Sequence, residues 1–154
     1  MKLNWPNEIT TETFVRDYWQ KKALLIRQAI PEFENPLTPD ELAGLALEEE
    51  VASRLILKED QGIWRCHHGP FDEADLQALP PRDWSLLISD VDKVLPEFQS
   101  YLEPFMFIPA WRIDDLMISY APPGASVGAH IDNYDVFLFQ ASGRREWSIT
   151  EDPN

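Results

Sequence analysis

The stretch GAHIDNYDVF, residues 128–137, places His130 and Asp132 two positions apart in a segment whose pattern predicts a β-strand. Successive side chains of a strand point to opposite faces, so residues 130 and 132 project from the same face. An imidazole nitrogen beside a carboxylate is two thirds of the 2-His-1-carboxylate arrangement, which binds Fe(II) and leaves open coordination positions. A histidine at a strand end paired with a turn aspartate fits the same pattern, and no histidine follows His130.

A second candidate lies in REWSIT, residues 145–150, where alternation places Arg145 on the same face as Trp147 and Ile149. These apolar partners predict that Arg145 points inward, where a guanidinium group needs an anion. Its planar fork suits a co-substrate that carries a carboxylate. A structural salt bridge to an inward aspartate explains the pattern equally well.

A third group comes from IDDLMIS, residues 113–119, where Asp115 and Met117 share one strand face. Tyr134 shares the face of His130 and Asp132 by the same rule. If the two faces line one cavity, its apolar walls and its acid suit a long cationic side chain. In the alternative interpretation, Met117 belongs to the core and Asp115 is solvated.

The other two histidines, His67 and His68, are adjacent, so on a strand they point to opposite faces and at most one assists His130. We expect both to be structural.

The composition of the 154-residue chain narrows the choice of partners. Its net charge is −14, so a phosphate backbone repels it and direct nucleic-acid binding is not expected. A basic protein or a cationic substrate is the better electrostatic match, although an acidic surface also serves solubility alone. Nothing approaches the roughly 20 apolar residues of a membrane helix. We therefore expect a soluble, cytoplasmic protein with no membrane partner.

The pattern along the chain predicts a single α+β domain over residues 1–154. Residues 1–110 mix helices and strands, and residues 111–154 read as strands and turns only. The expected elements of the first part are a helix from Thr10 or Thr11 to Lys22, a strand over 23–29, a capped helix over 38–51, a hairpin over 53–69, a short helical turn over 71–79, a strand at 84–88 and a helix over 91–105.

Several segments together resemble one family. They are FVRDYWQKKALLIRQA (14–29), TPDELAGLA (38–46), HGPF (68–71), WRIDDLMISYAPPG (111–124) and GAHIDNYDVFLFQASGRREW (128–147). The chain resembles the JmjC-type cupin oxygenases and, more narrowly, the bacterial ribosomal oxygenases that hydroxylate an arginine of a large-subunit ribosomal protein. The likeness runs over nearly the whole chain.

The resemblance implies an Fe(II)- and 2-oxoglutarate-dependent hydroxylase. His130 and Asp132 would be metal ligands, Arg145 would hold 2-oxoglutarate, and Asp115, Met117 and Tyr134 would hold the substrate arginine. The substrate would be a basic ribosomal protein. The family's fold is a double-stranded β-helix (cupin or jelly roll), to which residues 111–154 would contribute the first strands after an α+β flank over residues 1–110.

The resemblance covers only the N-terminal part of such enzymes. Members of the family supply a distal histidine ligand from a later strand and dimerise through C-terminal regions. We therefore expect an incomplete β-helix, an inactive chain on its own and a homodimer when full length. The alternatives are a catalytically dead, cupin-like protein-binding module and a metal cupin that uses no 2-oxoglutarate.

Overall fold

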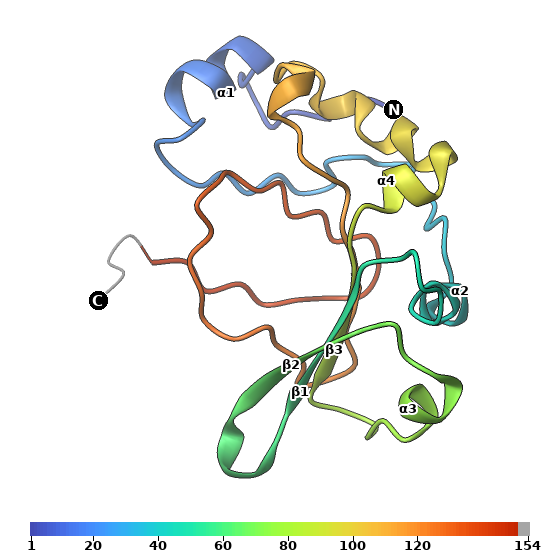
Figure 1. The fold of residues 1–154 in the computed structure, drawn as a ribbon. Helices are drawn as coiled ribbons and strands as arrows, with labels where there is room; N and C mark the ends of the chain where they lie inside the picture. Colours follow the sequence, from blue (N-terminus) through green and yellow to red (C-terminus); the bar gives the residue numbers. More distant parts are fainter. Residues whose placement is uncertain (151–154) are drawn as a thin grey trace.

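The computed structural model describes residues 1–150, which form short helices around one small antiparallel sheet (Figure 1). The α-helices are α1 (Thr11–Asp17), α2 (Pro39–Leu45), α3 (Glu73–Gln77) and α4 (Val91–Val94). The 3₁₀ helices are η1 (Asp60–Gly62), η2 (Pro96–Tyr101), η3 (Glu103–Phe105) and η4 (Ala110–Arg112). The strands are β1 (Ser53–Lys58), β2 (Trp64–His68), β3 (Trp84–Ile88) and β4 (Ile118–Tyr120). No helix of the described part is long and apolar enough to cross a membrane.

The sheet has the strand order β2-β1-β3-β4, and every neighbouring pair is antiparallel. The predicted hairpin is confirmed as β1 and β2, joined by η1, where Gln61 and Gly62 have φ angles of 67° and 79°. Glycine adopts such angles at no steric cost, which explains the turn at this point. This mixture of helices with an antiparallel sheet agrees with the α+β expectation.

The core lies between α2 and one face of the sheet. Its buried side chains are Leu42, Ala46, Val51, Leu55, Leu86, Ile88, Val91 and Phe98. The capping box that begins α2 is confirmed, because Thr38 Oγ1 accepts a hydrogen bond from Glu41 N at 3.2 Å and Glu41 Oε2 accepts one from Thr38 N at 2.8 Å. The helix ends at Leu45, earlier than the predicted 51.

The other face of the sheet turns toward the C-terminal segment. Directly opposed residues of antiparallel strands project from the same face. The pairs Arg54↔His68, Arg54↔Leu87 and Leu87↔Ser119 therefore form one row of side chains across all four strands. In the neighbouring row, Ser85 Oγ donates a hydrogen bond to Ser126 O at 3.3 Å, which ties the C-terminal segment to this face.

Two predictions of strands are wrong within the described residues. Residues 23–29 form no strand, and the predicted strands over 111–150 reduce to β4 alone, while 110–112 form η4. Figure 1 shows residues 121–150, in orange to red, as extended loops beside the sheet. An apolar alternating sequence becomes a strand only when a neighbouring strand satisfies its N–H and C=O groups in a continuous ladder, and within residues 1–150 these segments have only isolated backbone hydrogen bonds, such as Asn4 N to Ala29 O.

Candidate functional site

His130 and Asp132 lie side by side, as the sequence predicted, although no strand holds them. His130 Nε2 and Asp132 Oδ2 are 3.5 Å apart, and the two side chains are 49% and 40% exposed. A metal ion bound at about 2.1 Å to each atom fits between them. The donor set of one imidazole nitrogen and one carboxylate oxygen suits Fe(II).

The second ring nitrogen of His130 is held by the backbone. His130 Nδ1 lies 3.0 Å from Gly128 O. Because a carbonyl oxygen only accepts hydrogen bonds, Nδ1 carries a hydrogen in this contact, which leaves Nε2 as the ring nitrogen that faces Asp132 and can bind a metal. Metal-binding histidines are commonly oriented by a bond of this kind.

The turn before His130 is tied back to the sheet. Gly128 has a φ angle of 79°, and its N–H donates to Ser126 Oγ at 3.0 Å. Ser126 O in turn accepts the hydrogen bond from Ser85 on β3. Ser85 is only 1% exposed, so the chain of bonds starts from a fixed point of the fold. It positions His130 relative to the sheet.

The segment after the pair is anchored to the N-terminal region by aromatic rings. The ring of Phe137 lies 4.6 Å from that of Phe105 and 5.5 Å from that of Trp19. Gln20 Nε2 also donates to Asp135 Oδ2 at 2.9 Å. The residues that end α1 and follow it thus hold the chain on the C-terminal side of Asp132.

The described residues contain no third metal ligand near this pair. Within residues 1–150, no group of three or more His, Cys, Asp or Glu side chains is arranged to hold a metal ion. His67 and His68 both lie on β2, and His68 Nε2 is 3.9 Å from Cys66 Sγ. Neither assists His130 in this part of the chain.

Arg145 is half-buried and its neighbour Arg144 is exposed, which is the direction that the alternation predicted. The guanidinium carbon of Arg145 lies 5.5 Å from the ring centre of Trp147. The two side chains are therefore close together, as expected for residues two positions apart in an extended chain. Trp147 and Ile149 remain 46% and 70% exposed, so the expectation that they are inward-facing apolar partners of Arg145 is wrong within residues 1–150. Within residues 1–150, no carboxylate forms an ion pair with Arg145.

The three candidate substrate residues are only partly brought together. Asp115 Oδ2 accepts a hydrogen bond from Asp90 N at 3.1 Å, and Met117 Sδ lies 3.3 Å from Arg54 Nη2. Tyr134 is 68% exposed, and no hydrogen bond, ion pair or ring contact in the described part joins it to Asp115 or Met117.

The sequence interpretation missed Ser85, Ser126 and Arg54. The arginine carries a usable signal, since SRLILK places it on the strand face opposite the buried leucines. The two serines carry none, because their connection depends on how residues far apart in sequence meet.

Residues 100–154 match the family profile described as the JmjC domain. The chain is 44% identical over 151 residues to the ribosomal protein uL16 3-hydroxylase of Escherichia coli, covering 98% of this chain and 38% of that protein. It is also 44% identical over 144 residues to a probable ribosomal oxygenase of Haemophilus influenzae, covering 94% of this chain and 35% of that one. The structure of YcfD, an E. coli ribosomal oxygenase in complex with cobalt and 2-oxoglutarate, superimposes with a TM-score of 0.75 at 40% identity, over 85% of this chain and 34% of YcfD.

Residues 100–154 thus resemble the JmjC domain, and the fold and the His130–Asp132 pair agree with that likeness. Over nearly its whole length, the chain is a homologue of part of two ribosomal oxygenases, among them the uL16 3-hydroxylase of E. coli. The chain spans 38% and 35% of the lengths of the two curated relatives.

Proposed function

We propose that the protein is an Fe(II)- and 2-oxoglutarate-dependent hydroxylase that acts on an arginine side chain of a large-subunit ribosomal protein. The observation that carries the proposal is the His130–Asp132 pair, with donor atoms 3.5 Å apart and with Nδ1 of the histidine occupied by Gly128 O. Support comes from the relatives, one named a uL16 3-hydroxylase and one crystallised with cobalt and 2-oxoglutarate.

In this proposal His130 Nε2 and Asp132 Oδ2 hold the metal. When bound, Fe(II) supplies the oxidising chemistry, in which dioxygen converts 2-oxoglutarate to succinate and CO₂ and places one oxygen atom in a substrate C–H bond. The protein fixes the ligands, orients the substrate and keeps water from the reacting atoms. A distal histidine outside residues 1–150 would complete the ligand set.

Arg145 is the proposed anchor for the co-substrate. Its guanidinium group has no ion-pair partner within the described residues, so its fork is available for a carboxylate of 2-oxoglutarate. The side of the guanidinium that faces Trp147 is covered by the ring, which restricts the directions from which a ligand approaches.

The substrate arginine would be held by Asp115, with Met117 and Tyr134 along its apolar stem. One carboxylate oxygen of Asp115 is bound by the backbone of Asp90, and the other is directed to the ligand in this proposal. The net charge of −14 favours a basic ribosomal protein and disfavours direct contact with RNA.

For the whole protein we propose a single domain built on a double-stranded β-helix. Residues 1–110 would form its α+β flank, and residues 111–154 would become its first strands once other strands pair with them. We further propose that the protein is a cytoplasmic homodimer.

The function is tested by measuring the binding of 2-oxoglutarate by calorimetry in the presence of Co(II). Arg145→Ala should weaken 2-oxoglutarate binding at least about tenfold, because a charge-assisted bidentate bond is lost. Arg144→Ala is the matched control and should leave the affinity unchanged, since that neighbouring side chain is exposed. Equal behaviour of the two variants contradicts the assignment of the co-substrate.

A catalytically dead binding module is the second candidate. It is favoured by one observation, namely that residues 1–150 provide only two candidate ligands for the metal. The same titration separates the two functions, because a dead module binds a basic protein but shows no metal-dependent affinity for 2-oxoglutarate.

A further inference from the structure

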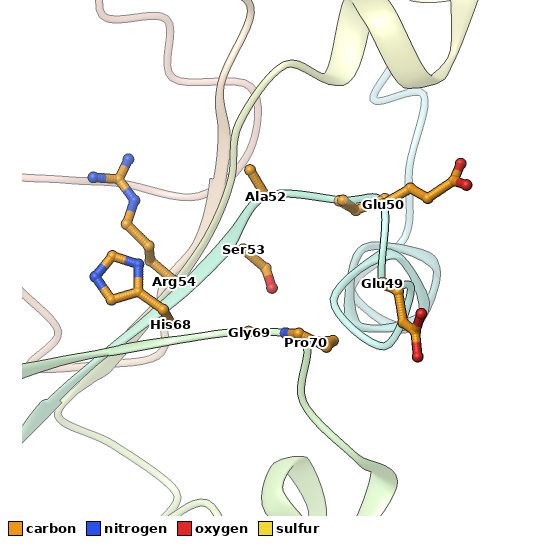
Figure 2. Close-up of a pocket in the computed structure, with 9 residues that line it drawn as sticks. Glu49, Glu50, Ala52, Ser53, Arg54, His68, Gly69 and Pro70 are labelled. Atoms are coloured by element: carbon orange, nitrogen blue, oxygen red, sulfur yellow. The ribbon is translucent and has the colours of Figure 1, made fainter.

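A pocket of about 380 Å³ lies at the start of β1 and the end of β2 (Figure 2). Its two ends differ in charge. Figure 2 shows the side chains of Arg54 and His68 on one side, and those of Glu49 and Glu50 on the other. Arg54 and His68 are directly opposed residues of the two strands, so their side chains rise from the same face of the sheet.

Arg54 is half-buried and has no anionic partner within residues 1–150. Its Nη2 lies 3.3 Å from Met117 Sδ and 3.5 Å from Ser89 Oγ, and both of these groups are uncharged. Within residues 1–150, no carboxylate forms an ion pair with Arg54, although the chain has 27 acidic residues. By contrast, Arg65 of β2 pairs with Glu59.

A half-buried Arg54 without a carboxylate partner among residues 1–150 is suited to bind a ligand that carries an anionic group. A partly desolvated guanidinium group gains most from a carboxylate, which accepts two parallel hydrogen bonds from its fork. His68 adds a ring that can donate to the same group. The contact between Arg54 and Met117 places this cationic end beside a residue of the proposed substrate slot.

We propose that this pocket binds an acidic side chain of the polypeptide substrate, close in sequence to the arginine that is modified. The inference rests on the proposed function, since it takes Met117 to be part of the substrate slot. Asp115 and Arg54 would then hold groups of opposite charge. This arrangement selects an arginine that has a carboxylate neighbour, rather than any basic segment.

The test is fluorescence anisotropy with the 154-residue chain and labelled peptides. Each peptide contains one arginine, and a single glutamate is moved through the three positions on either side of it, with glutamine elsewhere. The peptide with glutamate at one of these positions should bind about tenfold more tightly than the all-glutamine peptide, as expected for a charge-assisted hydrogen bond at a half-exposed site. The advantage should disappear in Arg54→Gln and shrink in His68→Gln.

The control is Arg65→Gln, because Arg65 is opposed to Leu57 and therefore projects from the other face of the same hairpin. The Arg65→Gln variant should still bind the best glutamate peptide more tightly than the all-glutamine peptide. If Arg54→Gln does not fold, the comparison of glutamate with glutamine on the unaltered chain, together with His68→Gln, still decides the question.

Three results would overturn the inference. In the first, no glutamate position binds better than glutamine. In the second, the advantage survives in Arg54→Gln. In the third, Arg54→Gln weakens binding of 2-oxoglutarate rather than of the peptide, which assigns the pocket to the co-substrate. The assay needs no turnover, so a failure of the hydroxylase proposal leaves a distinct pattern, namely glutamate-dependent binding without oxygen transfer.

Discussion

The carboxylate of Asp115 is held by the backbone of Asp90, whose N–H donates to Oδ2 at 3.1 Å. Two further bonds join the same segments, from Val91 N to Leu116 O at 3.0 Å and from Leu116 N to Asp92 Oδ1 at 2.8 Å. The proposed substrate acid is therefore fixed before any substrate arrives. A fixed carboxylate pays less ordering entropy when it binds a guanidinium group.

This bond allows the structural and the binding role of Asp115 to be separated. Asp115→Asn retains an oxygen that accepts the bond from Asp90 but loses the charge, so it should fold normally and bind an arginine peptide at least about tenfold more weakly. Asp115→Ala should in addition lower the free energy of unfolding by about 1 kcal/mol, because the bond is lost. Urea unfolding and peptide titration measure the two effects. An Asp115→Asn protein with unchanged peptide affinity would remove Asp115 from the substrate slot.

Gly128 and Gly143 provide a matched pair for testing how His130 is oriented. Both have positive φ angles, 79° and 73°, and both have open space where a Cβ atom would lie. Alanine at either position should cost a similar free energy of unfolding, about 1 kcal/mol. Only Gly128→Ala should also weaken Co(II) binding, by about tenfold, because it disturbs the carbonyl that orients the ring. Equal metal affinities in the two variants contradict this role.

The aromatic contacts of Phe137 should contribute to stability. Phe137→Ala should lower the free energy of unfolding by about 2 kcal/mol, less than for a fully buried phenylalanine because the side chain is 38% exposed. Phe139→Ala should cost about half as much, since Phe139 has one ring neighbour, Phe33, at 4.6 Å. Chemical denaturation of both variants measures the difference, and a smaller loss for Phe137→Ala argues against this anchor.

The capping box of α2 should make stability depend on pH. Hydrogen bonds from Thr38, first from its backbone N–H, lower the pKa of Glu41 from its usual value of 4.5. Because the pKa is lower in the folded state, this contribution is complete well above pH 4.5 and is lost as the pH falls through the folded-state value. The stability advantage over Glu41→Gln should therefore be present at pH 7 and shrink below about pH 4 in urea titrations. A constant difference across that range would show that the charge of Glu41 is irrelevant.

The elements that were predicted correctly from the sequence are held by contacts between residues that are close together in the chain. The capping box of Thr38 and Glu41 and the hairpin around Gly62 are closed by residues a few positions apart, so local pattern suffices. The strands expected over 111–150 need a backbone partner from elsewhere, and alternation alone says nothing about whether one is present.

The same distinction between local and tertiary contacts applies to the candidate site. The closeness of His130 and Asp132 follows from their spacing of two residues. The bond from Asp90 to Asp115 and the opposition of Arg54 to His68 depend on tertiary pairing, and no pattern within one segment encodes them.

The proposed activity is tested by mass spectrometry of a uL16 protein incubated with Fe(II), 2-oxoglutarate and the protein produced from the whole reading frame that encodes this chain. We expect the gain of one oxygen atom on an arginine of uL16, and the loss of that gain with the His130→Ala variant. A folded protein that binds Fe(II) and 2-oxoglutarate but adds no oxygen to an arginine, or whose His130→Ala variant adds it equally well, would contradict the assignment as an arginine hydroxylase.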